Sequence, residues 1–122
     1  MLVANQNGSL SSCDLPFLET LDEFNRTYLE LTEQVRQSGR DHELADRMIV
    51  GTSSLIRYEI DGAVNMYSGI FNNPFLIWGK YRASQDRTTL RLSFQFHHVQ
   101  MDGMEACRFL ELIQECADNL CV

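Results

Sequence analysis

The stretch that most constrains the fold is residues 88–103, TTLRLSFQFHHVQMDG. From Leu90 onward apolar and polar residues alternate strictly, and this period of two is typical of a strand with one buried face. The apolar positions are Leu90, Leu92, Phe94 and Phe96. The same parity places His98 on the buried face and His97 on the opposite one. The sequence therefore predicts a strand that carries a histidine to its end.

An acid and a turn follow the histidine pair. Asp102 stands four residues after His98 and Gly103 comes next, so a turn can fold the carboxylate back beneath the imidazole. A lone histidine at a strand end is more often a hydrogen-bonded structural residue than a catalyst. Here the histidines, the aspartate and the glycine lie between a strand and an amphipathic helix, and such a composite is more specific than a short pattern without context. We therefore interpret His98 as a candidate general base and Asp102 as its orienting acid.

General-base catalysis is the chemistry that these residue types suit, for example the activation of a hydroxyl for acyl transfer. The hydroxyl proton must leave as the oxygen attacks, and imidazole is the side chain whose unperturbed pKa lies nearest physiological pH. The tetrahedral intermediate needs a hydroxyl or a backbone N–H as donor to its oxyanion, and no metal is required. A metal bound by His97, His98 and Asp102 is disfavoured, because adjacent strand residues point to opposite faces.

Two helices are expected to cover the sheet. Apolar residues recur at helical spacing and predict a helix over about 15–38, with Asp14 as N-cap, Pro16 in its first turn and Gly39 at its end. A second helix is expected over 104–119. It presents apolar side chains to the core at Ala106, Phe109, Leu110, Ile113 and Ala117.

The remaining segments complete an α/β (α+β) prediction. We expect a helical turn at 41–47, a buried strand at 48–50 broken by 51–54, extended segments at 55–60 and 64–67, a turn at Asp61-Gly62, and a strand at 75–82. A turn at 84–86 pairs that last strand with the one ending at His98 as a hairpin. The predicted fold is a single domain, residues 1–122, with two layers, a largely antiparallel or mixed sheet and helices on one face.

Composition limits the class of partner. The net charge of −7 disfavours nucleic acid and anionic membranes, which bind clustered Lys and Arg. An apolar content of 44% without a long apolar run, and a start without basic or apolar targeting regions, predict a soluble chain that is neither exported nor inserted in a membrane. The four cysteines form no CxxC pair and no zinc spacing, which fits reduced thiols in a cytoplasm. They are Cys13, Cys107, Cys116 and Cys121.

The segment FQFHHVQMDGMEACRFLELIQ resembles the C-terminal signature of the chloramphenicol acetyltransferase family, and HHxxxDG is shared with other CoA-dependent acyltransferases and with condensation domains. Gly79-Lys80-Tyr81 resembles that family's GKY segment and lies at the same distance before the histidine pair. The resemblance implies an acetyl-CoA-dependent O-acetyltransferase, of the kind that confers antibiotic resistance, that acts on a hydroxylated acceptor and assembles as a trimer with active sites between subunits. It implies His98 as the catalytic base, a structural role for Asp102, and Lys80 and Tyr81 as CoA-binding residues. An ordinary solvated surface charge is the open alternative for Lys80.

The chain also departs from that pattern. The resemblance spans little more than the C-terminal half of a family domain, and the family's oxyanion-stabilising serine falls on Ile60, which has no hydroxyl. A hydroxyl at 52–54 takes the place of this serine only if the register of the alignment with the family shifts. The family's arginine partner of the motif aspartate is missing, which leaves other candidates, namely Arg57, Arg82, Arg91 and Arg108. A non-catalytic remnant acting as a binding module, and one half of a split enzyme with a complementing chain, therefore stand beside the enzyme hypothesis.

Overall fold

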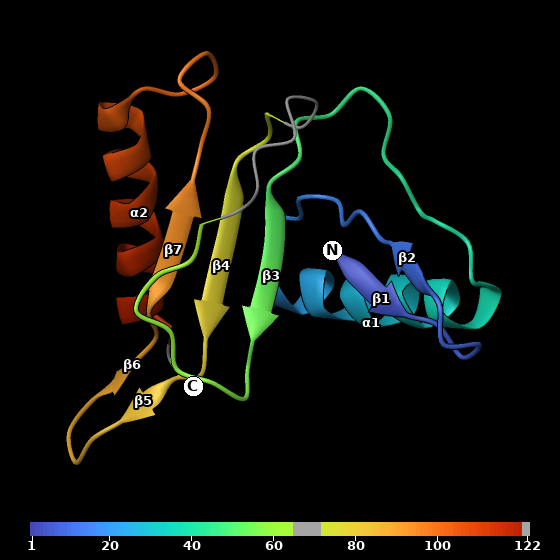
Figure 1. Cartoon of the computed structure of the whole chain (residues 1–122), viewed down its shortest axis with the longest axis horizontal. Helices are drawn as coiled ribbons and strands as arrows, with labels where there is room; N and C mark the ends of the chain where they lie inside the picture. The colour runs from blue at the N-terminus through green and yellow to red at the C-terminus, as the bar shows by residue number, and fades with distance from the viewer. Residues whose placement is uncertain (65–71, 121–122) are drawn as a thin grey trace. The chain divides into compact units, whose positions relative to one another are not determined.

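The computed structural model describes residues 1–64 and 72–120 (Figure 1). Within them the protein is a mixed α+β structure with two helices and antiparallel strand pairs, as the sequence predicts. The chain divides into two compact units, Met1–Ser53 and Ser54–Val122, with the division inside strand β3 (Gly51–Leu55). No helix in the described part of the chain is long and apolar enough to cross a membrane.

The first unit is built on a hairpin and a long helix. Strands β1 (Leu2–Ala4) and β2 (Leu10–Ser12) pair antiparallel, and helix α1 spans Leu21–Ser38. The buried core consists of Val3, Cys13 and Val35, with Met1, Leu15 and Leu31 packed against it. Burial raises the pKa of the Cys13 thiol, so this cysteine stays protonated and unreactive.

Helix α1 begins later than the sequence predicts. Thr20 is the N-cap and accepts a hydrogen bond from the Glu23 N–H at 3.3 Å. Asp14, the predicted cap, instead accepts from the Leu44 N–H at 3.0 Å, so its carboxylate fixes a neighbouring loop. The predicted end at Gly39 is confirmed, since Gly39 has φ 64° and its N–H donates to the Val35 carbonyl.

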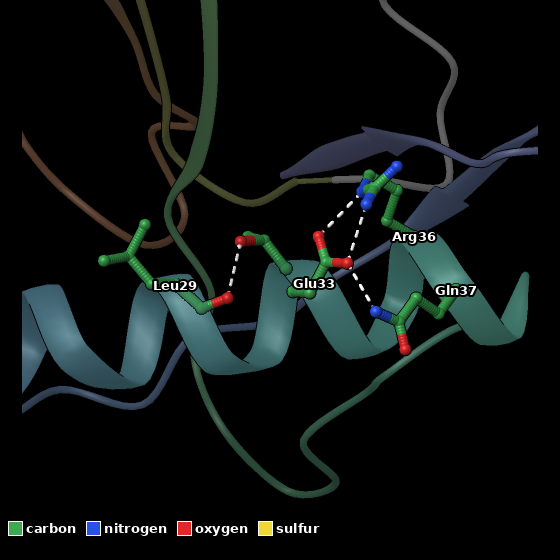
Figure 2. Close-up of polar contacts among 5 residues, drawn as sticks. Leu29, Glu33, Arg36 and Gln37 are labelled. Carbon is green, nitrogen blue, oxygen red and sulfur yellow. Dashed lines mark hydrogen bonds and ion pairs between the residues drawn. The ribbon is translucent and has the colours of Figure 1, made fainter.

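The exposed face of α1 carries local polar contacts (Figure 2). Glu33 accepts two hydrogen bonds from the Arg36 guanidinium, both at 2.7 Å, and another from the Gln37 amide. These contacts lower the pKa of Glu33, with the Arg36 hydrogen bond as the main cause. Solvent-exposed pairs of this kind contribute little to stability.

The segment between α1 and β3, in the first unit, differs from the prediction. At 41–47 there is no helical turn; His42 forms an isolated parallel bridge with Cys13, and the chain turns at 45–46, where Asp46 has φ 57°. Residues 48–50 have no regular structure, and the predicted break at Gly51 is the start of β3. Sheet pairing therefore overrides local hydrophobicity here, because β3 is an edge strand of the sheet β3-β4-β7.

The second unit contains the predicted hairpin. Strand β4 (Phe75–Gly79) pairs antiparallel with β7 (Leu92–Gln95). Beyond them β5 (Arg82–Ala83) pairs with β6 (Thr88–Thr89), and the Ser84 N–H donates to the Arg87 carbonyl at 2.8 Å to close the turn. The hairpin and its turn are confirmed, although the strand predicted to run unbroken to His98 is interrupted after Thr89 and ends at Gln95.

Helix α2 (Gly103–Asp118) packs beside β7 (Figure 1). The ring of Phe94 lies 4.8 Å from that of Phe109 and 5.8 Å from that of Phe96, so the predicted apolar face of the strand does meet the helix. Ala106 is buried and Phe109 and Ile113 are half-buried. The predicted core positions Leu110 and Ala117 are exposed. The buried and half-buried stripe of α2 consists of residues 106, 109 and 113, and positions 110 and 117 lie beside this stripe.

The segment after β3 runs alongside the hairpin. The predicted extended structure at 55–60 is wrong, because β3 ends at Leu55 and the chain turns at once. The Lys80 N–H donates to the Tyr58 carbonyl at 2.7 Å, and the Ser93 hydroxyl accepts from the Ala63 N–H and donates to the Ala63 carbonyl. The chain bends at Asp61, near the predicted turn. Most of the extended segment expected at 64–67 lies outside the described residues.

Replacing Gly79 by alanine is expected to destabilise the second unit. A Cβ at this position would lie 2.7 Å from the Tyr58 carbonyl oxygen and 3.0 Å from the Ile60 Cγ1, so the backbone of the segment must move. We expect a loss of about 1–3 kcal/mol, as for other overpacked sites, measured by urea unfolding. Gly62→Ala is the matched control, since a Cβ there meets nothing within 4 Å. Equal unfolding midpoints for the two variants would show that the Gly79 contact is unimportant.

Candidate functional site

His98 lies in a turn rather than on the buried face of a strand. The Gln100 and Met101 N–H groups both donate to the His97 carbonyl, at 2.9 and 3.1 Å, so the chain leaves the extended conformation before His98. The parity of the strand is lost there, and the predicted burial of His98 is wrong: its side chain is exposed. Its ring packs edge-on against Phe96, with centroids 6.0 Å apart. The imidazole is therefore open to a substrate.

His97 has the structural role that a histidine at a strand end often has. It is half-buried, and its Nδ1 accepts a hydrogen bond from the Val99 N–H at 3.1 Å. An accepting Nδ1 requires the neutral ring to carry its proton on Nε2. By contrast, no hydrogen bond reaches the His98 ring from the residues that the structure describes. The two imidazoles thus differ, with His97 engaged in the turn and His98 available.

Asp102 is the N-cap of α2. Its Oδ1 accepts from the Glu105 N–H at 2.9 Å, and the Glu105 Oε2 accepts from the Asp102 N–H at 2.9 Å, which completes a capping box. The carboxylate is exposed and bonds to its own helix rather than to His98. Asp102 therefore fixes the start of α2. Through that helix end it supports the turn that carries His98.

None of the arginines suggested as partners forms an ion pair with Asp102 within the described residues. Arg82 pairs with Glu59 at 2.6 Å, and Arg91 pairs with Asp61. Arg108 lies 3.8 Å from both Glu111 and Glu115 along its own helix. The same part of the chain contains no group of three or more His, Cys, Asp or Glu side chains placed to hold a metal ion.

Asp102→Ala is expected to lower stability through the helix end. Loss of the N-cap acceptor costs about 0.5–2 kcal/mol in comparable helices. Asp102→Asn keeps an acceptor oxygen and should retain most of the stability. Urea unfolding of the three proteins measures the difference, and an alanine variant as stable as the asparagine variant would argue against the cap.

Lys80 and Tyr81 lie in a surface groove at the base of the β5–β6 hairpin. The groove has a volume of about 700 Å³ and is lined by Glu59, Lys80, Tyr81, Arg82, Ala83, Ser84 and Thr89. Lys80 is exposed and the Tyr81 side chain is 59% exposed. Two cations, one carboxylate, two hydroxyls and an aromatic ring thus border one concave surface, which suits an anionic ligand with an aromatic group.

The other groove residues have no sequence pattern that predicts a shared site with Lys80 and Tyr81. Arg82 and Thr89 are cross-strand partners in the β5–β6 pair. The register of the predicted hairpin is therefore the signal from which their proximity follows. Glu59 comes from the segment after β3, and no local pattern links it to the hairpin. Its 2.6 Å contact with Arg82 exists only in the folded chain.

The β5–β6 hairpin and the connection from β7 to α2 lie at opposite ends of the β4–β7 pair (Figure 1). In the register of that pair Phe75 faces Gln95 and Trp78 faces Leu92, so Lys80 follows one end and His98 the other. At about 3.4 Å per residue, the eight residue steps from the level of Lys80 to His98 correspond to a separation of roughly 25 Å. The structure therefore does not bring the predicted catalytic and cofactor residues into one compact pocket, and a single ligand that reaches both must be long.

Ile60, which takes the place of the expected serine, lies at the groove end. Its Cγ1 is 3.0 Å from the position that a Cβ on Gly79 would occupy, and Gly79 directly precedes Lys80. The residue is therefore at the far end of the hairpin from His98. It offers no hydroxyl to an oxyanion.

Comparison with known proteins gives a distant relative. No family model matches the chain. The chain is similar to chloramphenicol acetyltransferase 3 from Escherichia coli, with 25% identity over 116 residues that cover 91% of this chain and 54% of that protein. The chain thus spans about half the length of the curated relative it matches. At this identity the match supports a distant relationship with the chloramphenicol acetyltransferases.

Proposed function

We propose that this chain is an acetyl-CoA-dependent O-acetyltransferase of the chloramphenicol acetyltransferase type. The observation that carries the proposal is the similarity to the Escherichia coli enzyme along 91% of the chain. The exposed His98 imidazole and the groove around Lys80 support it. Acetyl-CoA is the proposed co-substrate, a small hydroxylated molecule is the proposed acceptor, and the cytoplasm is the proposed location.

In the proposed reaction His98 acts as general base. Its free imidazole nitrogen takes the proton of the acceptor hydroxyl while that oxygen attacks the thioester carbonyl carbon. The tetrahedral intermediate collapses with cleavage of the C–S bond, and the imidazolium returns the proton to the CoA sulfur. His97 and Asp102 hold the turn, through the Val99 N–H and the end of α2. This division of roles requires no charge relay.

The groove is the proposed site for the phosphorylated end of CoA. Lys80 and Arg82 supply positive charge, and the Tyr81 ring is exposed enough to stack on a base. A thioester at His98 and phosphates at Lys80 would lie roughly 25 Å apart along the strands. CoA, with its long flexible arm, has the extended form that this spacing demands.

We further propose that the chain forms one domain that works as an assembly, either a homo-oligomer such as a trimer or a complex with a complementing chain. Among the described residues of the second unit, only Pro74, Gly79 and Ala106 are buried. The aromatic and aliphatic side chains of β4 and β7 remain half-exposed. Covering such side chains is the usual source of stability in obligate assemblies.

Release of free CoA thiol from acetyl-CoA tests the function. The purified chain is incubated with acetyl-CoA and a panel of hydroxylated acceptors, chloramphenicol among them, and each acceptor is examined by mass spectrometry for the acetyl group. Acceptor-dependent thiol release with matching acetylation supports the proposal. Thiol release that no acceptor changes, or none at all, would refute it.

A non-catalytic binding module is the second candidate. Two observations favour it: Ile60 lacks the hydroxyl, and no described residue forms a hydrogen bond to the His98 ring, which makes only an edge-on ring contact with Phe96. This candidate predicts that the chain folds and assembles but gains no thermal stability from CoA, whereas a ligand at 100 times its Kd adds about 2.7 kcal/mol. Solution mass with and without CoA separates monomer, trimer and hetero-complex. A stable monomer would exclude a split enzyme.

A further inference from the structure

The loop between β1 and β2 presents an Asn-Gly pair to solvent. Asn7 and Gly8 are exposed, and Gly8 has φ 84°. A Cβ built on Gly8 meets nothing within 4 Å, so this backbone position is open and unhindered. Asn7-Gly8 is the one asparagine followed by glycine in the sequence.

We propose that Asn7 is a site of spontaneous deamidation in the folded protein. The Gly8 backbone nitrogen loses its proton and attacks the Asn7 side-chain carbonyl carbon, and the C–N bond of the amide breaks to release ammonia. The cyclic imide that forms then takes up one water, and hydrolysis at either carbonyl gives aspartate or isoaspartate. The net reaction consumes water and yields ammonia, with no other reactant.

The hydrogen bonds of the loop favour the attack. The Asn7 Oδ1 accepts from the Ser9 N–H at 3.0 Å and from the Ser9 hydroxyl at 2.6 Å. Negative charge develops on this oxygen as the ring closes, and two preorganised donors stabilise it. Glycine at the next position adds no side chain to obstruct the nitrogen.

One contact opposes the reaction. The Gly8 N–H donates to the Asn5 carbonyl at 3.0 Å, and this bond must open before the nitrogen can attack. Because the donor, Gly8, is exposed, although Asn5 is buried, opening this single bond requires no unfolding of the core. The donors to Oδ1 persist in that opened loop, since both come from Ser9.

The product would weaken the packing of the loop on α1. The Gln6 N–H donates to the Arg36 carbonyl at 3.1 Å in the last turn of the helix. The Asn7 Nδ2 lies 3.8 Å from where a Cβ on Gly39, the C-cap, would be. Deamidation replaces the Asn7 amide, a hydrogen-bond donor, by a carboxylate. A negative charge beside the C-terminus of α1 is unfavourable, because this is the negative end of the helix dipole.

Incubation of the full chain at neutral and mildly alkaline pH, followed by peptide mass spectrometry, tests the proposal. We expect the peptide with Asn7 to show the mass change of amide-to-acid conversion sooner than the peptides with Asn25 or Asn119. The rate of this conversion should rise with pH. Ser9→Ala removes one donor to the Asn7 Oδ1, and also the acceptor of the Asn5 Nδ2 at 2.9 Å, and is expected to slow the reaction roughly tenfold, or about 1.4 kcal/mol in the barrier. Conversion in the urea-unfolded chain but not in the folded one would overturn the proposal, as would an unchanged rate in Ser9→Ala.

The effect of the product is tested with Asn7→Asp. We expect a lower urea midpoint than in the wild type, while Asn7→Gln, which keeps an amide and blocks the five-membered ring, retains more stability and does not deamidate at the wild-type rate. An aspartate variant as stable as the glutamine variant would overturn the proposed weakening of the loop. These readouts are independent of catalytic activity.

Discussion

Replacing His98 by alanine is expected to abolish acetyl transfer from acetyl-CoA. The exposed His98 imidazole in the turn after β7 is the proposed base, and general-base catalysis contributes about 10²- to 10⁴-fold to rate. We expect kcat/KM to fall by that factor in a continuous thiol-release assay, with the KM for acetyl-CoA little changed because the groove is at the other end of the hairpin. Stability should hardly change, since the ring makes one edge contact, with Phe96.

His97→Ala is the matched control for this variant. The His97 ring is half-buried and bonded to the Val99 N–H, so its removal should lower the urea midpoint more than the loss of His98 does. Activity should fall less, because the base remains. A wild type and a His98→Ala variant that are equally inactive would leave the enzyme proposal without support and favour the binding module.

The pairing of the hairpin could be predicted because its cause is local. Alternation from Leu90 to Phe96 identifies the face that meets Phe109, and the turn near Ser84 fixes the strand direction. The cap at Gly39 is equally local, because only the conformation at one residue decides it.

The errors arise where a distant group, or a turn that begins early, competes with the pattern of the sequence. Asp14 has the sequence of an N-cap, but the Leu44 N–H lies close enough in space to take its carboxylate. The burial of His98 was inferred by extending the strand, whereas the two hydrogen bonds to the His97 carbonyl end it first. The acid after the histidines was recognised as part of the motif, but its bond to the Glu105 N–H depends on where α2 begins.

Reversing the charge of Lys80 is expected to weaken CoA binding strongly. The groove holds two cations against one carboxylate, and a hydrogen bond to a charged group contributes about 1.5–3 kcal/mol. Lys80→Glu should therefore raise the Kd for CoA roughly 10- to 100-fold, measured by isothermal titration calorimetry. The effect should shrink as salt is added, because the groove is open to solvent. An unchanged Kd would reduce Lys80 to a solvated surface charge.

Glu59→Gln should act in the opposite direction. Glu59 occupies the Arg82 guanidinium at 2.6 Å, and both side chains are about half-exposed, so the pair itself contributes only about 0.2–1 kcal/mol. Removing the carboxylate leaves Arg82 with its longer contact to Asp61, at 4.0 Å, and makes the groove more positive, so Arg82 can bind a phosphate and CoA binding should tighten about two- to fivefold. Glu33→Gln on α1 is the matched control, since Glu33 also pairs with an arginine but does not line the groove. If the two glutamine variants bind CoA with the same Kd, Arg82 takes no part in CoA binding. If Glu59→Gln weakens CoA binding, the Glu59 carboxylate orients the ligand rather than competing with it for Arg82.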